Sequence, residues 1–185
     1  MIHDAQVRIV AGLGNPGPEY DRTYHNAGVL SLPFIAAELA TDDGPLAFIR
    51  YKKSFEYAKA GGWVFVRPLA YMNDSGAAVK DALKVFKAKP EDLAVAHDDS
   101  DLTLGSFKIV KGGGAAGHKG IRSIIEQIGT QEFLRIRIGI RAADETHRKK
   151  AGDFVLSTIA PAQMKVLEAA FGAAAHELLL KWPAA

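Results

Sequence analysis

The 185-residue sequence contains no cysteine. Disulfide bonds, thiolate ligands for metals and a cysteine nucleophile are therefore excluded. Because disulfides are rare in reducing compartments, this absence fits a cytoplasmic protein.

Long apolar runs are absent as well. The opening segment, MIHDAQVRIVAGLG, holds a short apolar stretch followed at once by loop residues, which predicts a first strand and not a signal peptide or a membrane span. Neither sign of charge dominates, since 23 Lys and Arg stand against 21 Asp and Glu, a formal net charge of +2. A surface that binds nucleic acid would therefore have to be a local basic patch.

The rest of the composition is that of an ordinary globular protein, with 48% hydrophobic and 24% charged residues. A chain of this length buries one good core and is short for two, so we expect a single domain over residues 1–185. The basic and polar segment 141–153 is assigned no role beyond a connection.

The spacing of apolar residues predicts an alternation of strands and helices. Strands are predicted at residues 7–11, 54–60, 63–68, 93–96, 107–110 and 133–140. The second and third flank Gly61-Gly62 as a hairpin would, and the last is expected to be half exposed. Helices are predicted at residues 25–40, 75–87, 121–128 and about 161–182. This order favours an α/β fold, a twisted mixed sheet with helices on both faces.

Polar clusters follow two of the predicted strands. GLGNPG follows the first strand, and HDDSD follows the strand at 93–96. Because ligands of open α/β sheets bind beyond the carboxyl ends of strands, these two loops are expected to converge on one crevice. Three further segments are rich in polar residues or glycine: TYHNAG at 23–28, YMNDSG at 71–76 and KGGGAAGHKG at 111–120.

The segment 12–17 contains G-x-G-x-x-G, the fingerprint of dinucleotide-binding folds. That fingerprint should open directly into a helix whose N-terminus holds the pyrophosphate. Here Pro16 and Pro18 interrupt it, and the helical pattern begins only near His25. The context therefore argues against a nicotinamide or flavin cofactor.

Metal and serine chemistry have little support. The six histidines are scattered, and no two of them have the i, i+4 spacing of a helical zinc site, so we expect no metal. There is also no G-x-S-x-G turn to present a serine nucleophile.

Histidine, aspartate and asparagine remain as the chemically active residues of the polar loops. A histidine takes a proton from water at neutral pH, and a carboxylate behind it fixes the tautomer. An asparagine NH that donates to a carbonyl oxygen as it gains charge is worth roughly 3–4 kcal/mol. This set predicts water attack on an acyl group without a covalent intermediate, and it does not name the substrate.

Several long motifs resemble the bacterial-type peptidyl-tRNA hydrolase family. They are, in order, GLGNPGPEY (12–20), TYHNAG (23–28), RPLAYMNDSG (67–76), VAHDDSDLTLG (95–105), GGGAAGHKGIRSI (112–124) and FLRIRIGI (133–140). The resemblance implies one mixed α/β domain without a cofactor. It also implies an enzyme that hydrolyses the ester between a peptide, or an N-blocked amino acid, and the 3′-end of tRNA, so that the tRNA can be reused in translation.

The resemblance assigns the catalytic roles. His25 matches the general base that activates water, and Asp98 matches the carboxylate that supports it. Asn15 matches the residue that tells a blocked amine from a free one, and Asn73 matches the residue that holds the peptide backbone and the water or carbonyl. From the residues alone, Asp99 and Asp101 compete with Asp98, and both asparagines are common turn or cap types.

The resemblance also assigns contacts with tRNA. Tyr20 and Tyr71 match positions along the groove for the 3′ CCA end and the peptide. Arg137 matches a basic residue near the acceptor stem, and Lys111 is a candidate phosphate contact. His118 is expected to form a hydrogen bond within its loop. The implied partner is peptidyl-tRNA, bound by a monomer.

The sequence departs from the family pattern near the substrate. Lys119 stands where an asparagine usually helps to bind substrate, and an ammonium offers three donors but no acceptor. Tyr24 replaces the arginine usual before the catalytic histidine, and Val110 replaces a lysine before the glycine run. An alternative therefore stays open: a weakly active or inactive relative that binds RNA.

Overall fold

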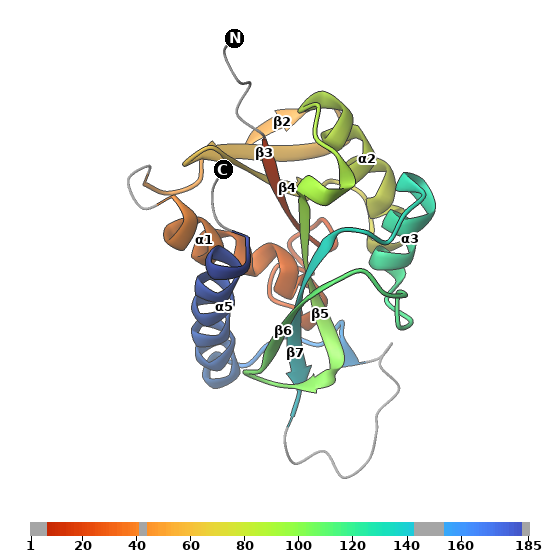
Figure 1. The fold of residues 1–185 in the computed structure, drawn as a ribbon. Helices are drawn as coiled ribbons and strands as arrows, with labels where there is room; N and C mark the ends of the chain where they lie inside the picture. The colour runs from red at the N-terminus through yellow and green to blue at the C-terminus, as the bar shows by residue number, and fades with distance from the viewer. Residues whose placement is uncertain (1–6, 41–43, 143–153, 183–185) are drawn as a thin grey trace.

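The computed structural model describes residues 7–40, 44–142 and 154–182. In this part of the chain one seven-stranded sheet forms the centre of the molecule (Figure 1). The strands are β1 (Arg8–Gly12), β2 (Ile49–Tyr51), β3 (Phe55–Ala60), β4 (Trp63–Pro68), β5 (Leu93–Thr103), β6 (Phe107–Lys111) and β7 (Leu134–Arg141). The α-helices are α1 (Ala27–Leu39), α2 (Ser75–Val85), α3 (Lys119–Ile128) and α5 (Pro161–Lys181). Short 3₁₀ turns occupy Tyr24–Asn26, Met72–Asp74 and Pro90–Asp92.

The strand order is β2-β3-β4-β1-β5-β7-β6. β4, β1, β5 and β7 run parallel to one another, while β2, β3 and β6 pair antiparallel with their neighbours. β1 has β4 on one side and β5 on the other, so the chain switches sides of the sheet there. Such a switch leaves a crevice beyond the carboxyl ends of the strands, where ligands of open α/β sheets bind.

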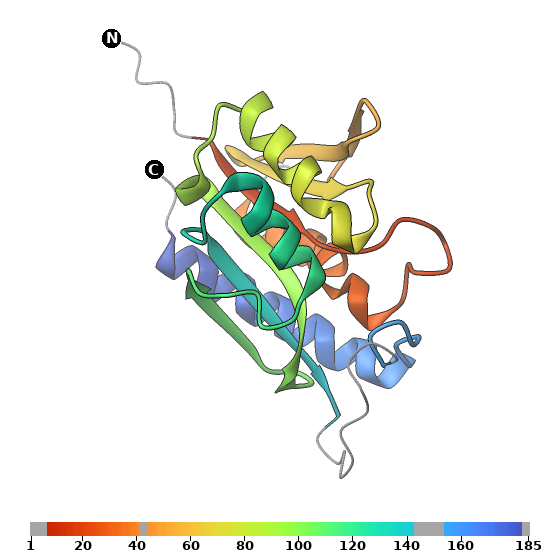
Figure 2. The same ribbon diagram turned by 90° about the vertical axis from the view of Figure 1, so that its right-hand side faces the viewer.

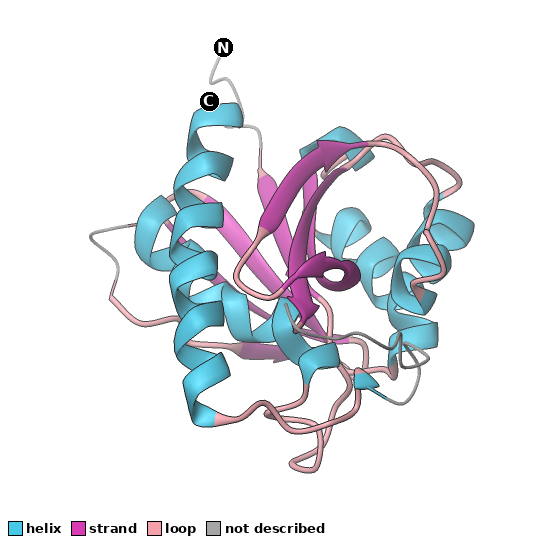
Figure 3. Cartoon of the chain, turned by 90° about the horizontal axis from the view of Figure 1, so that it is seen from below, coloured by secondary structure: helices cyan, strands magenta, loops and turns pink. Residues whose placement is uncertain are grey.

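Helices cover both faces of the sheet, as Figures 2 and 3 show. α1 and α5 pack on one face, and α2 and α3 pack on the other. The residues of β1 divide between the two cores, because successive side chains of a strand point to opposite faces. Val10 joins the core under α1 and α5, whereas Ile9 and Ala11 join the core under α2 and α3.

The end of α5 returns to the beginning of β1. The guanidinium carbon of Arg8 lies 5.5 Å from the ring centroid of Trp63 and 5.1 Å from that of Trp182. Nη1 of Arg8 also donates to the carbonyl oxygen of Trp182 at 2.9 Å. The two indole rings also contact each other edge-on at a centroid distance of 5.3 Å, so a cation and two aromatic rings tie these distant parts of the chain together.

The structure confirms the α/β class, the mixed sheet and the hairpin around Gly61-Gly62. The predicted helices are present within a few residues of their expected bounds, while the short edge strand β2 was not predicted. Among the described residues, no helix is both long and apolar enough to cross a membrane. Nearly all of the segment 141–153 lies outside the described residues.

Two predictions about strands were wrong. HDDSD is not a loop, because β5 continues through it to Thr103 and pairs with β7. The strand at 133–140 is not half exposed, because Arg135 on its polar side is only 6% exposed. In both cases polar side chains on the strand have polar partners elsewhere in the fold, which makes their burial tolerable.

The first turn of α1 packs directly against the backbone at the ends of β1 and β5. The amide of Val29 donates to the carbonyl of Leu13 at 3.1 Å. A Cβ atom on Gly28 would lie 2.2 Å from the carbonyl oxygen of Ala96 and 2.6 Å from the amide nitrogen of Leu13. Only glycine fits there, and this contact brings the turn before α1 over the carboxyl ends of β1 and β5.

We expect Gly28→Ala to lower the free energy of unfolding by about 2–4 kcal/mol, because the new methyl group meets backbone that cannot move aside. The matched control is Gly172→Ala in α5, where an added Cβ meets nothing within 4 Å. This control should be neutral or stabilising by up to about 1 kcal/mol, from helix propensity. Urea unfolding followed by circular dichroism measures both, and equal stability of the two variants would contradict the close contact.

Candidate active site

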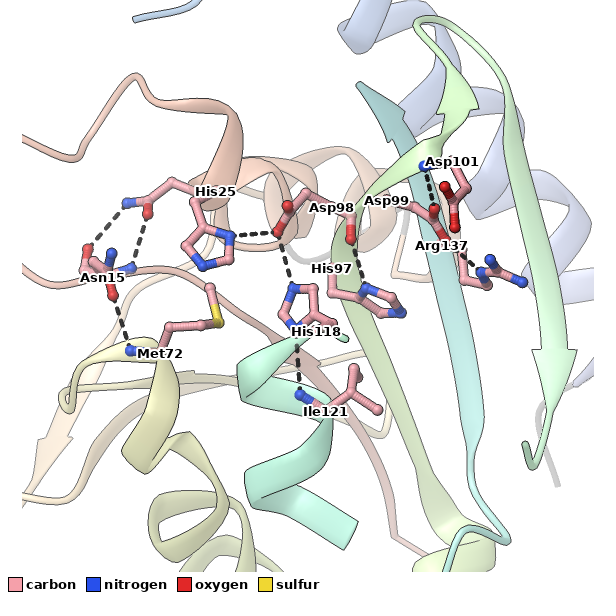
Figure 4. A network of polar contacts seen from close by, with 11 residues as sticks. Asn15, His25, Met72, His97, Asp98, Asp99, Asp101, His118, Ile121 and Arg137 are labelled. Atoms are coloured by element: carbon pink, nitrogen blue, oxygen red, sulfur yellow. Dashed lines mark hydrogen bonds and ion pairs between the residues drawn. The ribbon is translucent and has the colours of Figure 1, made fainter. Parts of the chain in front are cut away.

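A cleft of about 450 Å³ lies at the carboxyl ends of β1, β4 and β5. It contains the crevice that the polar loops were expected to form. Its lining includes Asn15, His25, Tyr71, Asn73, Asp98, His118 and Lys119. Figure 4 shows the polar network at its centre.

His25 lies in the 3₁₀ turn that leads into α1. Its backbone amide donates to the carbonyl of Val155 at 2.7 Å, which anchors the turn to the segment before α5. In its side chain, Nδ1 forms a hydrogen bond of 2.8 Å with Oδ1 of Asp98. Nε2 is therefore the ring nitrogen left to act in the cleft.

Asp98 lies within β5 and is only 3% exposed. Its Oδ1 receives two hydrogen bonds, one from His25 and one of 3.0 Å from Nε2 of His118. Burial would raise the pKa of Asp98, but the hydrogen bonds from His118 and His25 outweigh it and hold the pKa well below its usual range. The carboxylate therefore stays ionised at neutral pH.

The two neighbouring acids have other partners. Asp99 accepts a hydrogen bond of 2.5 Å from Nε of Arg137 and one from the amide of Asp101. Of the three aspartates that competed in the sequence, Asp98 is the one that contacts His25.

Asn15 lies in the loop after β1 and is held at both its backbone and its side chain. The side chain of Asn26, which sequence reasoning missed, accepts from the amide of Asn15 at 2.8 Å and donates to its carbonyl at 3.0 Å. Oδ1 of Asn15 accepts from the amide of Met72 at 2.8 Å. The loop after β1 is thereby joined both to the turn of His25 and to the turn of Asn73.

Asn73 is exposed in the 3₁₀ turn before α2 and lines the cleft. Its position depends on close packing of α2 against α3. A Cβ atom on Gly76 would lie 2.1 Å from the carbonyl oxygen of Ser123, and the amide of Gly76 donates to Oγ of Ser123 at 3.0 Å.

The two predicted tyrosines contact each other, but Tyr20 is not part of the cleft lining. Tyr71 lines the cleft and is 53% exposed. The ring of Tyr20 stands edge-on to it at a centroid distance of 6.3 Å. The pair presents an aromatic surface beside Asn73.

Two of the three basic residues that were predicted to contact tRNA line the cleft. Lys119, exposed at the first residue of α3, and Arg137 on β7 both line the cleft. Lys111 is exposed on the edge strand β6 and is not part of the cleft lining. Tyr24 is buried and stacks on Phe154.

Arg135 is a further residue that sequence reasoning missed. Its Nη1 donates to the carbonyl of Gly114 at 2.7 Å, and its Nη2 donates to that of Gly112. Burial, and then the charge of Arg137, lower its pKa from the usual arginine value. A guanidinium from β7 thus fixes the glycine-rich loop that leads to His118.

His97 contributes a neutral ring under the cleft. Its Nδ1 lies 2.7 Å from the carbonyl oxygen of Asp98, and its ring stands edge-on to that of His118 at 4.7 Å. Burial above all lowers the pKa of His97 to about 3. It therefore carries no charge at neutral pH.

His25, Asp98 and His118 also make up a potential ligand set, since one ligand atom of each lies within 4.8 Å of the others. Binding a cation there would require the histidines to release the protons that they share with Asp98. That no metal takes part stays a prediction.

Comparisons with known proteins identify the family. A family model described as peptidyl-tRNA hydrolase matches residues 9–182. Two proteins named peptidyl-tRNA hydrolase are similar in sequence. The one from Lactobacillus delbrueckii subsp. bulgaricus is 41% identical over 89% of this chain and 87% of its own length. The one from Aquifex aeolicus is 39% identical over 87% of this chain and 82% of its own length.

The fold has a solved counterpart. The crystal structure of peptidyl-tRNA hydrolase from Acinetobacter baumannii superposes with a TM-score of 0.77 at 27% identity, over 98% of this chain and 92% of that one. Sequence and fold thus agree along nearly the whole chain, which belongs to the peptidyl-tRNA hydrolase family.

Proposed function

We infer that this chain, as a member of the peptidyl-tRNA hydrolase family, hydrolyses the ester bond between a peptide or N-blocked amino acid and the 3′-end of tRNA. The observation that carries the assignment of the site is the 2.8 Å contact between Nδ1 of His25 and the buried carboxylate of Asp98. In this proposal His25 is the general base, and Asp98 orients it and stabilises its protonated form.

The ionised carboxylate keeps the proton of neutral His25 on Nδ1, so that Nε2 holds a lone pair. Nε2 accepts a proton from a water molecule as the water oxygen attacks the ester carbonyl. When the tetrahedral intermediate collapses, the imidazolium gives that proton to the departing ribose oxygen. One water molecule is consumed, and free peptide and tRNA leave.

Asparagine amides stabilise the charge that develops on the carbonyl oxygen. Because Oδ1 of Asn15 already accepts from Met72, its NH₂ group is the part that it presents to substrate. Asn73, the residue after Met72, also lines the cleft and offers a second amide. One donor placed in this way is worth about 3–4 kcal/mol. Asn15 is also the residue that we propose to distinguish a blocked amine from a free one.

The rim residues receive the RNA. We place the 3′ CCA end against Tyr71 and Tyr20, since stacking of a base on an aromatic ring is worth about 1–3 kcal/mol. Lys119 offers its ammonium to a phosphate near the cleft. Arg137 uses Nε for Asp99 and directs the rest of its guanidinium toward the acceptor stem. The enzyme acts as a cytoplasmic monomer in this proposal.

We expect His25→Ala to lower kcat by about 10²–10⁴-fold, the usual contribution of a general base. N-blocked aminoacyl-tRNA is the substrate for the assay, and retained binding of uncharged tRNA in a gel shift controls for folding. A wild type that binds tRNA but is as inactive as His25→Ala would instead establish the RNA-binding alternative.

We expect Asp98→Asn to lower kcat by about 10²–10⁴-fold with KM changed only a few-fold. The amide NH₂ of asparagine can donate to Nδ1 of His25, which favours the tautomer with the proton on the wrong nitrogen. Steady-state kinetics at pH 7 and a thermal unfolding control measure this effect. An unchanged kcat would contradict the role of the carboxylate.

We expect Lys119→Met to raise KM several-fold and to reduce the slope of log KM against log salt by about one, as loss of one phosphate contact does. The control is Lys84→Met, which removes an exposed charge of α2 outside the cleft lining. Lys119→Asn, which restores the family's residue, should show the same loss of salt dependence. An unchanged salt slope in both Lys119 variants would contradict the phosphate contact.

A further inference from the structure

His118 lies at the junction between the glycine-rich loop and α3, and both of its ring nitrogens are engaged. Nδ1 accepts a hydrogen bond of 3.2 Å from the amide of Ile121, which makes His118 the N-cap of α3. Nε2 lies 3.0 Å from Oδ1 of Asp98. The side chain is 9% exposed, and neither nitrogen is free for substrate.

The cap determines which nitrogen of His118 carries the proton. A backbone amide can only donate, so Nδ1 must offer a lone pair to Ile121. A neutral imidazole has one proton, which must then be on Nε2, where it points at Asp98. Protonation of both nitrogens would place two N–H groups against each other at the helix start.

A single oxygen of Asp98 therefore shares its charge between two donors, at 2.8 Å from His25 and 3.0 Å from His118. Hydrogen bonds to a charged group are the strong ones, and each donor reduces the charge that the other experiences. Without the donor on His118, Asp98 would stabilise the protonated form of His25 more strongly and would hold its own orientation less firmly.

We infer that His118 is a positioning residue: the first turn of α3 fixes its tautomer, and through Asp98 it sets the basicity and orientation of His25. This inference rests on the proposed function, because it concerns how the general base of that reaction is tuned.

The charged and titratable groups around this contact are few among the described residues. Asp98 is faced by His25, His118 and His97, and His97 stays neutral because burial lowers its pKa to about 3. The remaining charged or titratable groups that line the cleft are Tyr71, Asp99, Asp101, Lys119, Arg135 and Arg137. Asp99 is paired with Arg137, and Arg135 is bonded to loop carbonyls.

Two variants of His118 separate its roles. Asn at this position keeps a short acceptor that caps α3 but cannot reach Asp98. Gln places an amide NH near the position of Nε2, so it keeps the donor to Asp98 and loses the cap. Each variant thus removes one of the two hydrogen bonds and serves as the control for the other.

We expect His118→Asn to retain a melting temperature close to that of the wild type. The acid limb of its kcat/KM profile should move up by about 0.5–1 pH unit, because Asp98 then stabilises the protonated form of His25 more strongly. His118→Gln should show the reverse, a lower melting temperature and an acid limb within about 0.3 pH unit of the wild type, because a lost cap affects mainly stability. If both variants keep the acid limb of the wild type, the inference is overturned.

A nuclear magnetic resonance measurement tests the tautomer without any assay of activity. Long-range proton–nitrogen correlations of the wild type should find the proton of His118 on Nε2 and Nδ1 unprotonated near neutral pH. A proton on Nδ1 overturns the inference even in an active enzyme. Failure of the proposed function is recognised separately, as a wild type that does not hydrolyse the substrate.

Discussion

The carboxylate of Asp98 is the group on which the arrangement of the site depends. An ion on a buried strand destabilises a fold unless hydrogen bonds replace its lost hydration. Here two imidazoles supply them, one from the layer of α1 and one from the layer of α3. The same contacts that make the charge tolerable also join the two helical layers across the sheet. The site is therefore complete only when both layers are packed on the sheet.

The loops around this carboxylate are fixed mainly by hydrogen bonds between side chains and backbone. Asn26 holds the backbone of Asn15, and the side chain of Asn15 holds the amide of Met72. Arg135 on β7 donates hydrogen bonds to two carbonyls of the glycine-rich loop. Short polar side chains that bond to backbone pre-order these loops, which reduces the entropy lost when a substrate binds.

Local patterns were sufficient for most of the fold. The hairpin around Gly61-Gly62 and the helices follow from periodicity and turn chemistry, which act between near neighbours in sequence. The polar segment HDDSD has the composition of a loop, because nothing in its own sequence reveals that Asp98 and Asp99 find partners on other elements. The buried state of Arg135 was missed for the same reason.

The site could be predicted only in part. The motifs predicted that His25, Asp98, Asn15 and Asn73 share one crevice. All four residues line the cleft of the structure. The motifs did not reveal that Asn26 reaches back to Asn15, or that His118 turns from its loop to Asp98. Such contacts depend on the three-dimensional approach of segments and leave no spacing signal in the chain.

The cluster of Arg8, Trp63 and Trp182 lies at the amino end of β1, whereas the cleft opens beyond its carboxyl end. Both ends of the described chain therefore lie at the end of the sheet opposite the cleft. An affinity handle, fluorophore or fusion partner attached at either extremity would leave the approach of a bulky nucleic acid unobstructed, and surface immobilisation through such a handle would present the cleft to solution.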